Sequence, residues 1–404
     1  MGIWDELTGQ ADAVAIFSAA AGTRQEAATA SSAVSADVPA TAGDPSSMTH
    51  AWLVTGPPGS GRSNIAYAFA TALLATGPDD VAAERQVRAR THPDLGVLST
   101  ERVIITMLEV KQIVKTSQFS PSVGRYRVMV IEDADRMTER TSNVLLKALE
   151  EPPPRTVWIL CAPSEADLIP TIRSRVRTVR LRVPAVDEVA ALIARREGVD
   201  IATATRAARE SQSHIGMARR LATDEGARTR RARTLQIALG IGSVSDGVRA
   251  AATLLELAGE DAKAITAERD AEERASALHS LGVAPGGTIP PALRAQLKAL
   301  EEDQKRRATR SLRDGIDRIM VDLLSLYRDV LLLQLGAGVE LINLSIHADL
   351  LRASEQSSAA GTLAIMDAIA TARRRIESNV APALALEAML VSAARSRTMR
   401  EVSR

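Results

Sequence analysis

A glycine-rich segment at 56–63 has the residue types that bind phosphate. It follows an apolar run at 50–55 that is typical of a buried strand, and an alanine-rich run at 63–74 that is typical of a helix comes next. Glycines let backbone N–H groups turn toward an anion, and a helix N-terminus adds a positive partial charge. We therefore expect a nucleotide-binding loop, with a loop that keeps only its shape as the alternative. Its residues are Gly56, Pro57, Pro58, Gly59, Ser60, Gly61, Arg62 and Ser63.

Arg62 departs from the usual pattern of such loops, which have lysine at this position. A planar, longer guanidinium does not place its charge between the terminal phosphates as a compact ammonium does. The sequence is therefore compatible with bound ATP or ADP, with magnesium if either is bound. Weak or absent turnover is expected.

An acidic pair, Glu132 and Asp133, follows an apolar run at 127–131. In nucleotide hydrolases with a phosphate-binding loop, acids at the end of such a strand hold magnesium and polarise the attacking water. The usual order is Asp then Glu, so each carboxylate here has the wrong reach by one methylene. Hydrolysis depends on sub-ångström placement and should suffer more than binding. A solvated turn is the alternative.

Two further motifs are more restrictive. The segment 143–153, NVLLKALEEPP, resembles the segment NALLKxLEEPP of bacterial clamp-loader subunits, which are AAA+ proteins, and Ser174-Arg175 resembles their Ser-Arg-Cys motif with Val176 replacing Cys. The resemblance implies that Arg175 acts in trans, as an arginine finger on the ATP of a neighbouring subunit. An ordinary surface arginine is the alternative.

Shorter matches extend the resemblance over most of the chain. Gln10 matches the opening Gly-Gln of the family, and 92–94 is the family's His-Pro-Asp. Gly216 to Arg219 resembles its sensor-2 segment, which implies a phosphate contact for Arg219, with a solvated side chain as an equal alternative. The segment 379–387 resembles the end of the family's collar domain.

Departures from the motor subunits of this family indicate which subunit the chain resembles. Arg62, the inverted acidic pair and Ala162-Pro163 at the sensor position all argue against strong catalysis, and 79–90 lacks the cysteines of the motor's zinc site. A subunit that keeps Arg175 but loses its own machinery resembles the delta-prime subunit. No zinc is expected.

The fold class predicted by the hydrophobic pattern is α/β, with a parallel sheet. Strands are expected at 50–55, 102–105, 127–131, 156–161 and 176–183, with helices at 3–20, 63–74, 106–117 and 141–149. The resemblance makes this an AAA+ core at 1–183 with a flexible insertion at 21–47, then a small helical lid at 184–223 and an all-α collar at 224–404. The apolar stripe through 312–330 serves packing within the chain or between subunits.

Composition restricts the setting. The 50 basic and 49 acidic residues nearly cancel, which argues against a chain that wraps DNA by a global basic field. A single cysteine, Cys161, excludes an internal disulfide and fits a reducing cytoplasm. The start lacks a secretory pattern and no run reaches ~18 apolar residues, so a cytoplasmic protein without membrane contact is expected.

The resemblance implies a replisome subunit in a hetero-pentamer with motor (gamma/tau) and delta subunits. It would load a sliding clamp on primed DNA as a rigid stator of the DNA polymerase III holoenzyme, a DNA-directed DNA polymerase. One alternative is an active gamma/tau-like ATPase motor, for which multiple turnover would depend on Ser63 and Asp133. Another is a stand-alone AAA+ remodelling ATPase. Direct DNA contact stays open, since Arg85, Arg88 and Arg90 are more simply a solvated face.

Overall fold

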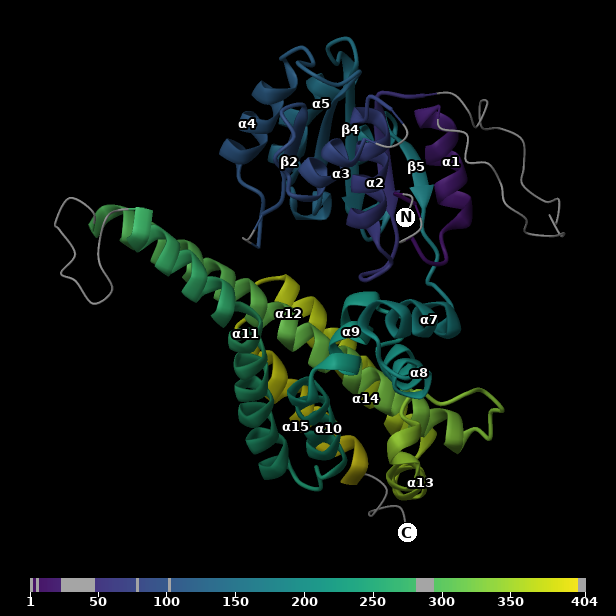
Figure 1. Ribbon diagram of the computed structural model, residues 1–404. Coiled ribbons are helices and arrows are strands. Elements are labelled where there is room, and N and C mark those ends of the chain that lie inside the picture. The colour runs from purple at the N-terminus through teal and green to yellow at the C-terminus, as the bar shows by residue number, and fades with distance from the viewer. Residues whose placement is uncertain are drawn as a thin grey trace, which may run out of the picture. The chain divides into compact units, whose positions relative to one another are not determined.

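The chain forms two compact units, residues 1–219 and 220–404, which are described separately (Figure 1). The computed structural model describes residues 3–4, 7–22, 48–77, 80–100, 103–280 and 294–398. The first unit contains the expected core and most of the expected lid. Of the insertion expected at 21–47, residues 23–47 lie outside the described part. The division into three domains remains a prediction.

A five-stranded sheet forms the centre of the first unit. All its described pairs are parallel, and the strand order is β2-β3-β4-β1-β5. Three central strands are buried along their whole length, as expected for a parallel sheet covered on both faces. The strands are β1 (Ala51–Thr55), β2 (Leu95–Leu98), β3 (Arg127–Ile131), β4 (Thr156–Ala162) and β5 (Arg177–Arg180).

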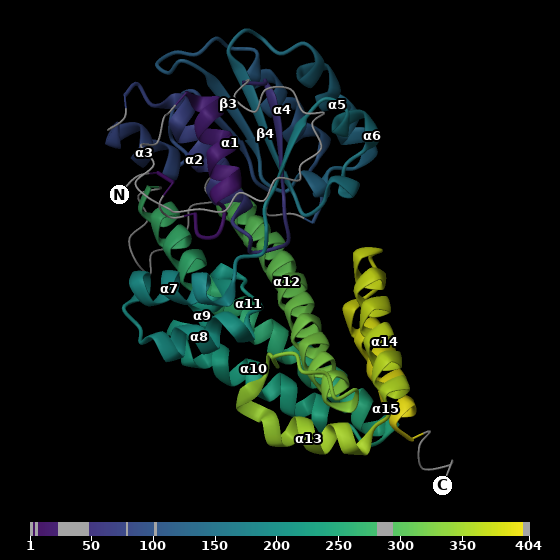
Figure 2. The same cartoon turned by 90° about the vertical axis from the view of Figure 1, so that its right-hand side faces the viewer.

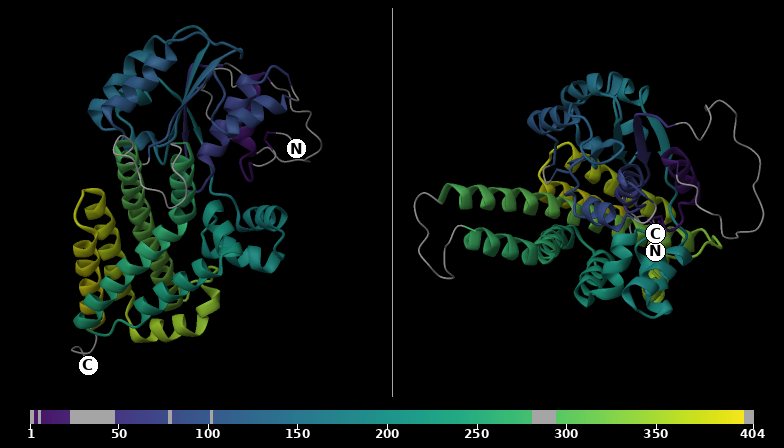
Figure 3. Two further views of the ribbon diagram at one scale, coloured as in Figure 1. Left: turned by 60° about the vertical axis from the view of Figure 1, so that its left-hand side comes forward. Right: turned by 45° about the horizontal axis from the view of Figure 1, so that its top comes forward.

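Helices cover both faces of this sheet (Figures 2 and 3). On one face an aromatic cluster of Phe17, Trp52 and Phe69 packs at ring-centroid distances of 4.5–5.4 Å. The other face buries Met129, Trp158 and their neighbours. The first face carries α1 (Ala11–Ala21), α2 (Arg62–Leu74) and α3 (Val81–Arg88), and the second carries α4 (Met107–Ser117), α5 (Glu139–Glu150) and α6 (Pro170–Arg173).

Local signals explain where these helices begin. Thr106 and Glu109 form a capping box at the start of α4, and the side chain of Thr138 caps α5. Pro170 occupies the first position of α6, where its missing N–H costs nothing. Two 3₁₀ turns, Ala134–Arg136 and Glu165–Asp167, follow β3 and β4.

One predicted strand is wrong. At 102–105 the described residues contain only an isolated bridge from Ile105 to Met137, and Ile104 is exposed. The sheet instead uses β2, which contains Gly96. A Cβ at this glycine would lie 1.9 Å from the Cε atom of Met129, so packing against the neighbouring strand requires glycine at position 96. Glycine is also a poor strand former, which explains why the sequence pattern did not predict β2. The parallel α/β class is confirmed by the rest of the sheet.

The remaining helices of the first unit follow the sheet. They are α7 (Val186–Glu197), α8 (Ile201–Glu210) and α9 (Ile215–Thr223), the last of which continues into the second unit. Gly198 ends α7 in the left-handed conformation.

All regular elements in the described part of the second unit are helical, as predicted. The helices α11 and α12 run side by side as a long pair (Figures 1 and 3). The predicted stripe on α12, including Ile316, Leu323 and Tyr327, is buried in the core of this unit and therefore serves packing within the chain. The elements are α10 (Glu225–Leu239), α11 (Val244–Ser280), α12 (Arg294–Gln334), the 3₁₀ turn Leu344–Ile346, α13 (His347–Gln356), α14 (Ala359–Glu377) and α15 (Pro382–Thr398).

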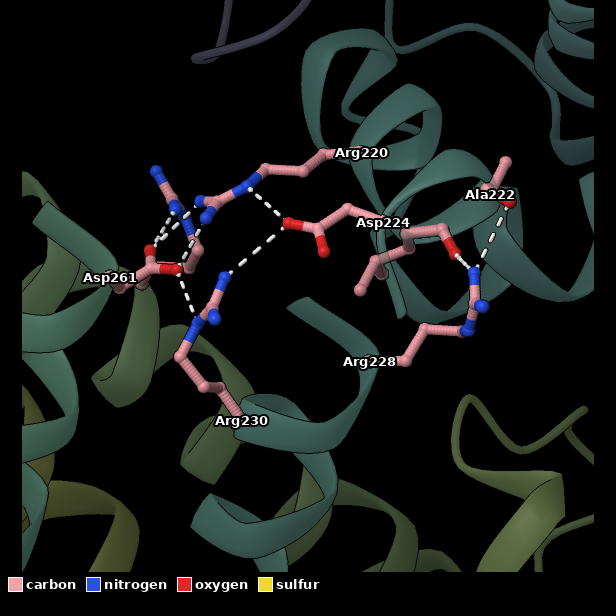
Figure 4. Close-up of polar contacts among 8 residues, drawn as sticks. Arg220, Ala222, Asp224, Arg228, Arg230 and Asp261 are labelled. Carbon is pink, nitrogen blue, oxygen red and sulfur yellow. Dashed lines mark hydrogen bonds and ion pairs between the residues drawn. The ribbon is translucent and has the colours of Figure 1, made fainter. Parts of the chain in front are cut away.

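Asp261 on α11 is the centre of a polar cluster in this unit (Figure 4). Arg220 donates to both of its oxygens at 2.9 and 2.6 Å, while Arg230 and Arg318 each donate one hydrogen bond at 2.9 Å. Burial opposes ionisation, but these arginines hold the pKa of Asp261 below its ordinary value. The cluster therefore ties the start of the unit, α10 and α12 to α11.

No helix in the described ranges is both long enough and apolar enough to span a bilayer.

Candidate functional site

The glycine-rich loop connects β1 to α2, as expected of a phosphate-binding loop. Gly59 and Gly61 have φ angles of +81° and +90°, which favour glycine. A Cβ at Gly59 would lie 2.3 Å from the ring of His214, so any side chain there would displace the histidine. The close approach of His214 to the loop was not foreseen from the sequence.

Hydrogen-bond donors of the loop remain available to a ligand. The backbone N–H groups of Gly61, Arg62 and Ser63, at the start of α2, donate to no acceptor within the described residues. The hydroxyl of Ser60 is buried and likewise has no partner there. Unpaired N–H groups at a helix N-terminus are suited to bind an anion. Such an arrangement is suited to hold a phosphate group.

Gln10 holds this loop in position. Its side-chain amide donates to the carbonyl of Ser60 at 3.3 Å and to that of Arg182 at 2.9 Å, and it accepts from the Arg182 N–H at 3.2 Å. The side chain is buried. The Gly-Gln match at the start of the chain thus corresponds to a contact between the loop and the chain beyond β5.

Arg62 turns back on its own loop. Its guanidinium donates to the carbonyl oxygen of Gly56, and the thiol of Cys161 donates to the carbonyl of Arg62 at 3.8 Å. Burial raises the pKa of Cys161 to about 12, so the thiol stays protonated. The charge of Arg62 therefore lies at the first residue of the loop.

Glu132 lies opposite the loop and is the acid that meets Ser63. The Ser63 hydroxyl donates to Oε2 of Glu132 at 3.3 Å, the hydroxyl of Tyr67 donates to Oε1, and a guanidinium nitrogen of Arg90 lies 2.8 Å from Oε1. Burial and the charge of Glu132 raise the pKa of Tyr67, so the phenol remains a donor. Two hydroxyl donors and one full positive charge therefore surround this carboxylate.

The other acids after β3 have different partners. An oxygen of Asp133 lies 3.9 Å from Nε of Arg136. Burial, together with the charge of Asp133, raises the pKa of Asp135. The inverted pair thus places glutamate, rather than aspartate, next to the loop.

These residues do not fit a magnesium ion. Mg²⁺ requires oxygen ligands in an octahedral arrangement and is reluctant to lose water. The one carboxylate that meets Ser63 is already paired with Arg90 and bonded to Tyr67. A cation at this carboxylate would face the charge of Arg90 at short range.

Arg175 lies just after α6 and is bound within its own chain. Its guanidinium lies 2.6 Å from Oε1 of Glu150, and it donates to the Thr171 carbonyl at 2.8 Å and the Ser174 hydroxyl at 3.0 Å. Glu150 belongs to the LEEPP segment, so the structure brings the two restrictive motifs together. The side chains of Arg175 and Glu150 are 35% and 44% exposed, which leaves the pair accessible.

Arg219 lies on α9 and pairs with Glu197, the last residue of α7. Its Nε lies 2.8 Å from the glutamate oxygen. The phosphate contact implied by the sensor-2 resemblance stays a prediction.

Besides His214, sequence reasoning missed two partners of Glu132. Tyr67 lies four residues after Ser63, so the helical period puts both on one face of α2, and this spacing could have identified it. Arg90 was assigned to a solvated face. It follows α3 with a φ of +59°, which is uncommon for a residue other than glycine. The sequence of this polar segment gives no sign of that backbone conformation.

Comparison with known proteins agrees with the motifs. Residues 41–185 match the family described as "DNA polymerase III, delta subunit". Proteins named DNA polymerase III subunit delta' are 34% identical over 134 residues in Pseudomonas aeruginosa and 32% over 143 residues in Escherichia coli. These alignments cover 31% and 33% of this chain and 41% and 43% of those relatives. The chain thus matches less than half the length of these curated relatives.

Proteins named for the gamma or gamma/tau subunit are similar as well. DNA polymerase III subunit gamma/tau of Mycobacterium tuberculosis is 29% identical over 166 residues, which cover 39% of this chain and 29% of that protein. A DNA polymerase III gamma subunit-related protein of Thermotoga maritima is 16% identical and covers 86% of this chain and 94% of its own, at a TM-score of 0.39. That score is too low to support an argument. The resemblance to delta-prime clamp-loader subunits drawn from the motifs is thus confirmed over residues 41–185, where this chain resembles the DNA polymerase III delta family.

Proposed function

We propose that this protein is a clamp-loader subunit of a bacterial DNA polymerase III that acts as a stator. It assembles in the cytoplasm with motor (gamma/tau) and delta subunits, and the complex loads a sliding clamp on primed DNA. Arg175 completes the ATP site of a neighbouring motor subunit as an arginine finger. The chain's own site holds ATP or ADP with little or no turnover.

The observation that carries this proposal is that Glu132, in the chain's own nucleotide site, already has partners within the chain, whereas Arg175 lies at an accessible position. Glu132, which would have to serve hydrolysis, is bound by Arg90 and Tyr67. Arg175, by contrast, is accessible. Its guanidinium pairs with the exposed Glu150 and otherwise donates to the neutral oxygens of Thr171 and Ser174. Exposed ion pairs contribute about 0–1 kcal/mol, so a phosphate on a partner can replace this glutamate.

The test is a reconstituted complex. The chain is purified with the motor and delta subunits of the same organism, and DNA-dependent ATP hydrolysis is measured with wild type, Arg175→Ala and the control Arg173→Ala. Arg173 is exposed and lies two residues earlier. Arg175→Ala should lower turnover at the affected site by about 10³-fold or more, as for other arginine fingers, whereas Arg173→Ala should not.

The gamma/tau similarity makes an active motor the second candidate. If the isolated chain hydrolyses ATP as fast as the complex, and if this activity is lost on Ser63→Ala or Asp133→Asn, the chain is a motor and the stator proposal is wrong. Failure to assemble with either partner would favour a stand-alone ATPase.

A further inference from the structure

The carboxylate of Glu132 is a candidate metal ligand, but it already forms an ion pair with Arg90. Oε1 accepts from Tyr67 and lies 2.8 Å from Arg90, while Oε2 accepts from Ser63 at 3.3 Å. The Glu132 side chain is only 14% exposed. Its charge is therefore balanced inside the chain by Arg90, which follows α3, and its oxygens also accept from two hydroxyl groups of α2.

Arg90 has an unusual backbone conformation and two side-chain partners. Arg90 has a φ of +59°, a left-handed conformation in which a residue with a side chain is uncommon and glycine is favoured. Its N–H donates to the carbonyl of Val87 at 2.9 Å, which ends α3. Its guanidinium lies over the ring of Tyr67, 5.4 Å from the centroid. The same side chain thus has a charged partner in Glu132 and an aromatic one in Tyr67.

A divalent ion cannot share this carboxylate without close repulsion. Mg²⁺ binds carboxylate oxygens at about 2.1 Å, so an ion on Oε1 would lie within about 5 Å of the Arg90 nitrogen. Displacing Arg90 would leave the Tyr67 hydroxyl still donating to the same oxygen. The donors for phosphate at the start of α2 do not involve this cluster, because they are backbone N–H groups.

We propose that Arg90 takes the place of the divalent cation in this site, so that the chain binds the polyphosphate of a nucleoside di- or triphosphate without magnesium. The proposal rests on the nucleotide binding proposed above but is independent of the stator role and of Arg175. It would also account for the weak turnover proposed above, because a site that excludes the metal would lack the cation that stabilises a leaving phosphate.

The experiment measures nucleotide affinity in the isolated full chain. Fluorescent ADP is titrated with wild type, Arg90→Gly and the control Arg88→Ala, each in millimolar Mg²⁺ and in excess chelator. Glycine suits the backbone at position 90, so Arg90→Gly removes the charge without straining the fold. Arg88 lies on α3 and pairs with Glu84 instead.

Wild type and Arg88→Ala should bind ADP equally well with and without Mg²⁺, within about twofold. Arg90→Gly should bind at least about tenfold more tightly with Mg²⁺ than in chelator, since one charge-assisted contact is worth about that much. Mn²⁺ used with ADP should give an electron paramagnetic resonance signal of bound metal only in Arg90→Gly. Arg90→Lys, which keeps the charge, should remain indifferent to Mg²⁺.

Three outcomes would overturn the proposal. One is wild-type binding that requires Mg²⁺, another is an Arg90→Gly variant as indifferent to metal as wild type, and the third is no nucleotide binding by wild type in either condition. Each leaves the assembly and Arg175 experiments unaffected. A failure here therefore differs from a failure of the stator proposal.

Discussion

Asp94 is a buried carboxylate whose ionisation should stabilise the first unit. It precedes β2 and accepts hydrogen bonds from the N–H groups of Ser122, Val123 and Gly124 at 2.6–2.8 Å. The Ser122 hydroxyl and a guanidinium nitrogen of Arg127 add two more at 2.9 and 3.1 Å. Burial opposes ionisation, but these donors lower the pKa of Asp94 from 3.8 to about 2.

The size of the effect follows from this pKa. A folded value of about 2 against 3.8 in the unfolded chain contributes about 2 kcal/mol, which is fully present above pH 5. About half of it should be lost by pH 3, and the rest as the pH falls through the folded pKa. In Asp94→Asn the buried Arg127 also loses its counter-charge, so we expect a loss of about 3–5 kcal/mol at pH 7.

Tryptophan fluorescence makes this measurable in a protein of two units. The three tryptophans, Trp4, Trp52 and Trp158, all belong to the first unit. Urea unfolding followed by tryptophan fluorescence therefore reports this unit alone. The control is Asp80→Asn, because Asp80 also accepts backbone N–H groups, as the cap of α3, but is only partly buried, whereas Asp94 is fully buried.

The result can refute the reasoning in two ways. Asp94→Asn should lose much more stability than Asp80→Asn at pH 7, and its deficit against wild type should shrink between pH 7 and pH 3. Equal losses in the two variants would show that the carboxylate is not the organising group of this loop. A deficit that stays constant with pH would show that its ionisation does not contribute.

Two further predictions concern arginine partners. Glu150→Ala frees Arg175 from an exposed ion pair, so DNA-dependent ATP hydrolysis by the reconstituted complex should change by no more than about fivefold. A loss as large as that of Arg175→Ala would contradict the proposed role of Arg175 as an arginine finger. Asp261→Asn leaves Arg220, Arg230 and Arg318 without their shared charge and should destabilise the second unit by about 3 kcal/mol. Circular dichroism of its thermal unfolding checks this, and an unchanged midpoint would show that the cluster is solvated.

Periodic sequence patterns were sufficient for most of the first unit. The run at 127–131 coincides with β3, and the amphipathic pattern at 106–117 corresponds to α4 with its cap, Thr106. β2 was missed because Gly96 is a poor strand residue, and only the side chain of Met129 on the neighbouring strand shows why glycine is required there. The period of the hydrophobic residues thus predicts most helices and strands. A strand such as β2, which lacks that period, is explained only by its contacts with a neighbouring strand.

The individual departures of the candidate site were visible in the sequence, but their coupling was not. Arg62 and the Glu132-Asp133 inversion each predict weaker hydrolysis when considered alone. The pairing of Glu132 depends on Arg90, whose guanidinium is directed by a left-handed backbone and by the ring of Tyr67. No local pattern encodes that combination, because its members come from three segments.

The contact between Glu132 and Arg90 changes how the Glu132-Asp133 inversion is expected to affect hydrolysis. If the inversion alone weakened catalysis, one methylene of misplacement would be the whole defect. In the structure the carboxylate next to Ser63 is also neutralised by Arg90, and Arg62 is bonded to the Gly56 carbonyl. Restoring lysine at position 62, or reversing the acids, would therefore still leave a site whose charge is balanced without metal. Under the proposed stator role, weak or absent hydrolysis would then be a property of the whole loop and its surroundings. Such a property would suit a subunit that keeps its shape while its neighbours hydrolyse ATP.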